Sequence, residues 1–156
     1  MNITIREITD RAEKRRISAA ILAALPDWFG LPDSTREYIE QSADLPFWAA
    51  EQGSSCVGFA ALKLTSPHTA EVYVMGVLPN HHHRGIGREL LEAMESRARA
   101  LGCSFMQVKT VQMGRYPEYD RTNRFYLAMG FREFECFPTL WDEWNPCQVY
   151  VKYIGE

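Results

Sequence analysis

One segment constrains the fold more than any other: a strand pattern that ends at a proline, followed by a short basic loop and two glycines that open a helix. It runs Val77-Leu78-Pro79-Asn80-His81-His82-His83-Arg84-Gly85-Ile86-Gly87-Arg88. Residues 69–78 have the composition of a strand, and apolar side chains recur at helical spacing over residues 85–101. A second, buried-looking strand follows at residues 104–110. The sequence therefore predicts a right-handed strand–helix–strand crossover with these two strands parallel.

Further strands and helices are expected around this unit. Alternating or apolar runs bounded by turn residues predict strands at 2–8, 46–51, 56–64, 131–136 and 147–154. Helical periodicity predicts helices at 10–24 with Asp10 as N-cap, at 35–41 with Ser34 as N-cap, and at 122–129. Gly102 suits the position just after the long helix. The expected fold class is α/β, with a mixed central sheet and four helices.

Composition limits the class of protein. The 156 residues, 46% of them hydrophobic, suit one compact domain over residues 1–156 that needs no metal or disulfide. Cysteine occurs four times without a CxxC pair, as expected for free thiols in a reducing cytoplasm. The net charge of −3 argues against a general nucleic-acid binder. We expect no signal peptide and no membrane span, because no run approaches about 20 apolar residues.

The glycine turn has the chemistry of an anion cradle. Glycine at positions 85 and 87 lets the backbone approach a ligand closely, and the first amides of the helix point at that ligand. Arg84 and Arg88 add positive charge. A Walker P-loop is excluded because no Gly-Lys-Ser/Thr follows, and a Rossmann site is disfavoured because the third glycine is missing. A tight turn with glycines used only for packing remains the alternative.

Two segments together resemble the GNAT (GCN5-related N-acetyltransferase) family. Residues 77–91 are similar to its motif A, V-x-P followed by R/Q-x-x-G-x-G/A and an amphipathic helix, although His82 stands where Arg or Gln is usual. Residues 122–131 are similar to motif B, F/Y-Y-x-x-x-G-F, with Tyr126 at its tyrosine. Tyr119 stands where an asparagine is frequent. The order and separation of the two motifs are more specific than either motif alone.

The resemblance implies binding of acetyl-CoA as cosubstrate and an N-acetyltransferase activity. Its pantetheine arm would pair with the strand backbone, and its pyrophosphate would rest on the amides of the turn. A backbone N–H near Gly76 or Val77 would polarise the thioester carbonyl. The cofactor-binding residues implied in this way are Met75, Gly76, Val77, Arg84, Gly85, Ile86, Gly87 and Arg88.

The resemblance also implies two catalytic residues, Glu71 and Tyr126. An alkylamine is almost entirely protonated at pH 7, so a base must remove its proton, and Glu71 matches the position of the glutamate base in the histone-type members. The alternative is a solvated strand glutamate. Tyr126 would hydrogen-bond to the leaving thiolate; the alternative is a core tyrosine packed against Phe125 and Phe131.

The acceptor is not determined by the sequence: an amino acid, polyamine, aminoglycoside, peptide terminus or lysine all fit. In this family the first two helices and the late hairpin border the acceptor, so we expect Trp28, Phe29 and residues 137–147, with Asp142 and Glu143, to form its site. Such a lining would suit a cationic amine, and packing alone is the alternative.

A homodimer is compatible with the resemblance. Adjacent histidines at 81–83 do not converge on an ion, so no metal is expected. A non-catalytic acyl-CoA-binding module and an unrelated nucleotide binder are the alternative functions.

Overall fold

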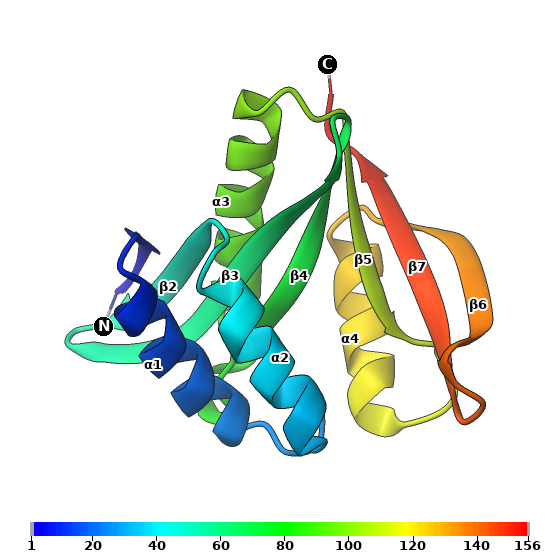
Figure 1. The fold of residues 1–156 in the computed structure, drawn as a ribbon, viewed down its shortest axis with the longest axis horizontal. Helices are drawn as coiled ribbons and strands as arrows, with labels where there is room; N and C mark the ends of the chain where they lie inside the picture. The colour runs from blue at the N-terminus through cyan, green and yellow to red at the C-terminus, as the bar shows by residue number, and fades with distance from the viewer. Residues whose placement is uncertain (1, 156) are drawn as a thin grey trace. The chain divides into compact units, whose positions relative to one another are not determined.

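The computed structural model describes residues 2–155 (Figure 1). Its elements follow the order that the sequence pattern predicts, with one additional 3₁₀ turn. They are β1 (Ile3–Ile8), α1 (Arg11–Ala23), α2 (Pro32–Ser42), β2 (Phe47–Gln52), β3 (Ser55–Ser66), β4 (Thr69–Val77), η1 (Pro79–His81), α3 (Ile86–Ala100), β5 (Phe105–Val111), α4 (Pro117–Ala128), β6 (Arg132–Asp142) and β7 (Asn145–Tyr153).

The strands form a seven-stranded mixed sheet in the order β1-β2-β3-β4-β5-β7-β6. The pairing of β4 with β5 is parallel, whereas β1–β2, β2–β3, β5–β7 and β6–β7 are antiparallel. The predicted α/β class, the mixed sheet, the parallel pair and the four helices are therefore confirmed. The parallel register covers Thr69–Glu71 of β4 against Phe105–Gln107 of β5.

The chain divides into two compact units. The first extends to Lys63 and also contains Val72–Arg97, and the second contains Leu64–Glu71 and the chain from Ala98 onward. The expectation of one domain over the whole chain stays a prediction. None of the helices that the structure describes is long and apolar enough to cross a membrane.

The core of the first unit lies between helix α1 and the β1–β4 strands. Phe47 and Phe59 are fully buried and stack with their ring centroids 5.3 Å apart. Ile21 and Leu22 of α1 belong to the same buried cluster. Helix α1 begins where the sequence predicts, because the Asp10 carboxylate accepts a hydrogen bond from the Glu13 backbone N–H at 2.8 Å.

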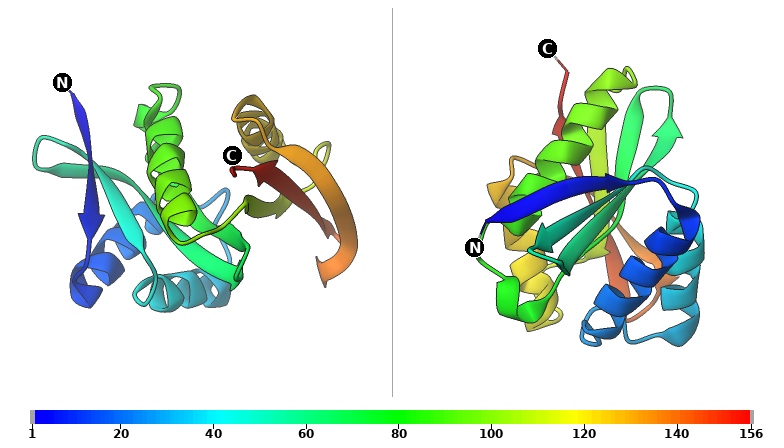
Figure 2. Two further views of the ribbon diagram at one scale, coloured as in Figure 1. Left: turned by 90° about the horizontal axis from the view of Figure 1, so that it is seen from above. Right: turned by 90° about the vertical axis from the view of Figure 1, so that its left-hand side faces the viewer.

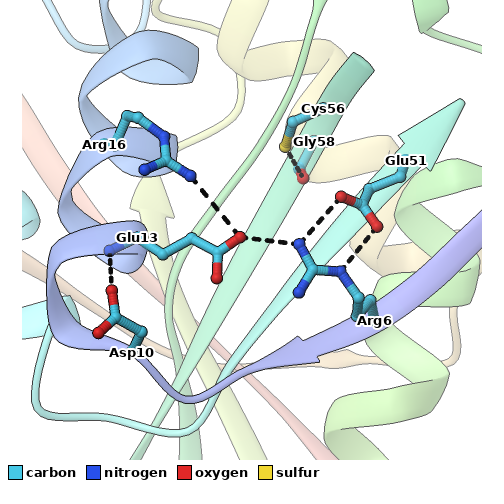
Figure 3. Close-up of polar contacts among 7 residues, drawn as sticks. All are labelled: Arg6, Asp10, Glu13, Arg16, Glu51, Cys56 and Gly58. Atoms are coloured by element: carbon cyan, nitrogen blue, oxygen red, sulfur yellow. Dashed lines mark hydrogen bonds and ion pairs between the residues drawn. The ribbon is translucent and has the colours of Figure 1, made fainter. Parts of the chain in front are cut away.

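A charged network joins β1, α1 and β2 at the surface of this unit (Figure 3). The Arg6 guanidinium donates to both oxygens of Glu51, at 2.8 and 3.1 Å, and to Glu13 at 2.8 Å. Arg16 adds a longer contact to Glu13 at 3.7 Å. One guanidinium can serve two carboxylates because its N–H groups form a planar fork, so Arg6 ties two strands to the start of α1.

In the second unit, α4 covers one face of the β5–β7–β6 strands (Figures 1 and 2). Asn123 of α4 is completely buried and donates from Nδ2 to the Val111 carbonyl at 2.8 Å and to the Tyr119 carbonyl at 2.6 Å. Its Oδ1 accepts from the Tyr150 hydroxyl of β7. Because Tyr150 lies opposite Val108 in the register, Val108 faces α4, and Lys109, its neighbour on β5, faces the other way.

Two helices begin earlier than predicted, in both cases at a proline. Helix α2 begins at Pro32 after Leu31, with no side-chain cap, so the expected N-cap at Ser34 was wrong. Helix α4 begins at Pro117 rather than Thr122. Proline at the first helical position loses no hydrogen bond and has a suitable φ, so it starts a helix as readily as it ends one. Gly102 has φ +88° after α3, as predicted.

Candidate functional site

The predicted anion cradle lies in the first unit, between the end of β4 and the start of α3. Gly85 has φ +79°, and a Cβ built on it would have no atom within 4 Å, so the space beside its backbone is open. The first amides of α3, those of Ile86, Gly87 and Arg88, precede the Glu89 N–H that donates to the Gly85 carbonyl at 3.1 Å, so they lack partners within the helix. Arg84 and Arg88 are exposed and make no ion pair within residues 2–155. Backbone donors and two available cations therefore occur together, as an anion requires.

Two of the three histidines before the cradle, His81 and His82, form hydrogen bonds that stabilise the loop. His82 Nε2 donates to the Val77 carbonyl oxygen at 2.7 Å, and its ring packs edge-on against Trp28 with centroids 5.9 Å apart. His81 Nε2 lies 3.1 Å from Gln52 Oε1. His83 has φ +64°, a conformation uncommon for a side-chain-bearing residue. Among the described residues no group of three or more His, Cys, Asp or Glu side chains is placed to hold a metal.

The strand segment expected to pair with a pantetheine, Met75–Val77, has a packing role at its centre. A Cβ on Gly76 would lie 2.9 Å from Leu25 Cδ1 and 3.1 Å from Ile21 Cγ2. A side chain here would therefore force Leu25 and Ile21 to shift. The Val77 carbonyl oxygen already accepts the His82 hydrogen bond, and carbonyl oxygen has a second lone pair for another donor.

Glu71 lies in the second unit and is nearly buried, with 7% of its surface exposed. Its Oε2 forms an ion pair with Lys109 Nζ at 3.1 Å. The alternative interpretation, a solvated strand glutamate, does not describe this environment. Sequence reasoning missed Lys109, since its approach to Glu71 follows from the β4–β5 register, in which Glu71 lies opposite Gln107. Lys109 lies two residues after Gln107 on β5, so its side chain is on the same face of the sheet as Glu71.

Tyr126 lies on α4 in the second unit and is 5% exposed. Its ring packs edge-on against Phe125 and Phe131, with centroids 5.1 and 5.4 Å away. Burial raises the pKa of its hydroxyl, so the group keeps its proton at neutral pH. Among residues 2–155 the hydroxyl makes no hydrogen bond. Its ring is thus part of the core, and its hydroxyl has no hydrogen-bond partner among these residues.

The residues expected to line an acceptor site have other contacts in the structure. Phe29 packs against Tyr38 at 5.8 Å, and Trp28 packs against His82. The Asp142 carboxylate accepts from the backbone N–H groups of Trp144 and Asn145, each at 2.9 Å, and these bonds lower its pKa together with one from the Asn145 side chain. Asp142 therefore closes the β6–β7 turn, and its oxygens are occupied within the protein.

Comparison with known proteins gives a consistent result. The family model described as "Acetyltransferase (GNAT) family" matches residues 9–131. A relative from Pseudomonas putida, named amino-acid acetyltransferase, is 32% identical over 98 residues, which are 62% of this chain and 20% of the relative. The N-alpha-acetyltransferase RimI of Mycobacterium tuberculosis is 33% identical over 86 residues, 53% of this chain and 49% of the relative. The chain thus spans from a fifth to about half the length of these relatives.

Among solved structures, a GNAT family acetyltransferase from Elizabethkingia anophelis with acetyl-CoA bound is similar over 97% of this chain and 98% of that chain. Its TM-score is 0.74 at 17% sequence identity. At this identity the likeness concerns the fold alone.

Proposed function

The chain belongs to the acetyltransferase (GNAT) family, and on this premise we propose that it is an N-acetyltransferase that moves an acetyl group from acetyl-CoA to a primary amine. The observation that supports the proposal most strongly is the cradle at Arg84–Arg88, where an open glycine, the start of a helix and two unpaired arginines coincide. A phosphorylated cosubstrate suits these groups.

The residues of the cradle fit the diphosphate of acetyl-CoA. The amides of Gly85, Ile86 and Gly87 would bind its oxygens, and Arg84 and Arg88 would add charge. The backbone of Met75–Val77 offers strand-like pairing to the pantetheine. When bound, acetyl-CoA supplies a thioester whose carbonyl carbon bonds to the amine nitrogen as its C–S bond breaks, so that CoA departs as a thiolate.

Glu71 and Tyr126 would handle the protons of this exchange. The acceptor amine gives up one proton to the Glu71 carboxylate before or during attack. Tyr126 donates a hydrogen bond to the sulfur that becomes negative, and the thiolate then takes its proton from solvent. A raised pKa suits this role for Tyr126, because the hydroxyl donates without losing its proton. We also propose that the protein acts in the cytoplasm. Its four cysteines are free, as is usual in a reducing compartment.

The test is thiol release from acetyl-CoA across a broad panel of primary amines. We expect turnover with one class of amine, and a fall of about tenfold or more in kcat for Glu71→Gln and for Tyr126→Phe. Tyr153→Phe is the matched control, because Tyr153 is 58% exposed and has no proposed role. Unchanged turnover in both active-site variants would refute these roles while leaving the activity.

A non-catalytic acyl-CoA-binding module is the second candidate, favoured by His82 and Tyr119 at motif positions where other residues are usual. It predicts CoA binding in a titration with no thiol release on any amine. Loss of CoA binding on Arg84→Ala and Arg88→Ala would support the cradle under either function.

A further inference from the structure

The proposed function leaves one charged group of its own site unused, Lys109. Its Nζ lies 3.1 Å from Glu71 Oε2, and its side chain is 34% exposed, against 10% for Glu71. An ammonium group has three donors, and Glu71 is the one partner of Lys109 among the described residues. Lys109 therefore keeps donors that face solvent.

Glu71 also keeps a free oxygen. Its Oε1 has no partner in the part of the chain that the structure describes, and it is absent from the set of side-chain atoms that are both buried and unpaired. Oε1 therefore reaches solvent. The ion pair consequently presents one anionic acceptor and one cationic donor next to each other to any ligand that arrives.

The pair lies on the face of the sheet opposite to α4. Gln107 and Lys109 alternate with Val108, which faces α4 as the register partner of Tyr150. Gln107 donates to Thr65 Oγ1 at 2.9 Å and so is already engaged beside the pair. Tyr126 belongs to α4. A ligand of the Glu71–Lys109 pair would thus approach from the face that does not carry α4.

The spacing of the pair matches one kind of amine. In an α-amino acid, covalent geometry places the amine nitrogen about 2.5 Å from the carboxyl carbon. Glu71 Oε2 and Lys109 Nζ are 3.1 Å apart, so the ammonium of a bound amino acid would contact Glu71 while its carboxylate contacts Lys109. The two charges of the ligand and the two of the protein would then alternate in sign. Polyamines, aminoglycosides and peptide termini offer no carboxylate beside the amine, and their cations would meet the positive Lys109.

A buried thiol next to the pair carries no charge of its own. Cys147 is the buried neighbour, and burial raises the pKa of its thiol to about 11, against a smaller opposing effect of Lys109. The thiol is neutral at pH 7, so the charge balance belongs to Glu71 and Lys109.

We propose that the acceptor is a free α-amino acid, with Lys109 as the residue that selects it through its carboxylate. This rests on the proposed function and names its acceptor class. The ammonium of the amino acid gives one proton to Glu71, and the freed amine forms the N–C bond as the C–S bond of the thioester breaks. The nitrogen then loses its second proton to solvent, the thiolate takes one proton from solvent, and the carboxylate stays unreacted on Lys109.

The experiment compares each amino acid with the amine that lacks only its carboxylate, by two readouts. The first is kcat/KM for thiol release from acetyl-CoA, and the second is the Kd from calorimetric titration into the CoA-saturated protein. We expect each amino acid to be preferred about tenfold or more over its matched amine, as one charge-assisted hydrogen bond provides. Lys109→Met should remove that preference, and Lys109→Arg should retain part of it.

Lys152→Met is the matched control, because Lys152 lies on β7 opposite Met106 and hence on the other face. It should leave the preference unchanged. Equal binding of amines with and without the carboxylate, or a preference that survives Lys109→Met, would overturn the proposal. Absence of amino-acid binding would also overturn it, even if other amines were acetylated. Selective binding without thiol release would instead uphold the amino-acid site and refute the acetyltransferase function.

Discussion

At the scale of single residues, Asn123 shows how much one buried amide can hold together. It satisfies the Val111 and Tyr119 carbonyls and the Tyr150 hydroxyl at once. The bonds to the Val111 carbonyl and to the Tyr150 hydroxyl are buried, so these two groups cannot turn to water if the amide is removed. The amide thus fixes α4, and with it Tyr126, against β5 and β7.

We expect Asn123→Ala to destabilise the protein by about 3 kcal/mol, because it leaves several buried polar groups without partners. Chemical denaturation measures this. Tyr150→Phe, which removes one hydroxyl, should cost about 1 kcal/mol. A cost for Asn123→Ala no larger than that of Tyr150→Phe would show that the two carbonyls find other donors.

The structural roles that could be predicted from the sequence are those that depend on neighbouring positions in the chain. The Asp10 cap and the Gly102 turn depend on a few neighbouring positions, and both are confirmed. Asn123 and Lys109 could not be assigned in this way, because their partners lie on other strands and helices and depend on the register. The turn cap made by Asp142 could likewise not be assigned from the sequence, and its expected place at the acceptor site stays a prediction.

At the scale of elements, the contact between α1 and β4 depends on a missing side chain. A Cβ on Gly76 would approach Ile21 of α1 and Leu25, which follows α1, more closely than carbon atoms normally do. The helix could respond only by moving away or by distorting those side chains.

Gly76→Ala should therefore cost about 1–3 kcal/mol of the free energy of unfolding. A double-mutant cycle with Leu25→Ala tests the cause. If the Cβ clashes with Leu25, the loss caused by Leu25→Ala should be smaller in the Gly76→Ala background. If the two losses of stability were additive, the added Cβ would act through a contact other than Leu25.

The order of helices and strands could be predicted because their hydrophobic periodicities differ. The first residues of α2 and α4 could not be predicted. Pro32 and Pro117 appeared to be loop residues, since a proline ends a helix as well as starting one. The choice depends on whether the following residues find a surface to pack on. That information lies in the tertiary structure.

For the whole molecule, acid should weaken the fold partly through the Arg6 network. The hydrogen bond from Arg6 lowers the pKa of Glu51 below the ordinary value near 4.3. A carboxylate whose pKa is depressed in the folded state stabilises it above the ordinary value, and that stability is lost as the pH falls through the folded-state pKa. The Arg6 side chain is 45% exposed, so solvent screens the network and we expect its contribution to be small.

Denaturation curves between pH 7 and pH 3 measure this contribution. Glu51→Gln should lower stability at pH 7 and reduce the further loss on acidification. Arg36→Gln is the control, since the Arg36–Asp33 pair is exposed on both sides. An unchanged pH dependence in Glu51→Gln would show that other carboxylates, such as Asp142, account for the acid sensitivity.

The alternation of β5 also has an evolutionary consequence. Met106, Val108 and Thr110 share the face that anchors α4, whereas Gln107 and Lys109 share the opposite face. If the acceptor binds to Lys109, a mutation at position 107 or 109 would change what the protein recognises without disturbing the face that anchors α4. Lineages that descend from such a chain would then exchange one acceptor for another by single substitutions, and a gene library randomised at positions 107 and 109 should consist mainly of folded proteins.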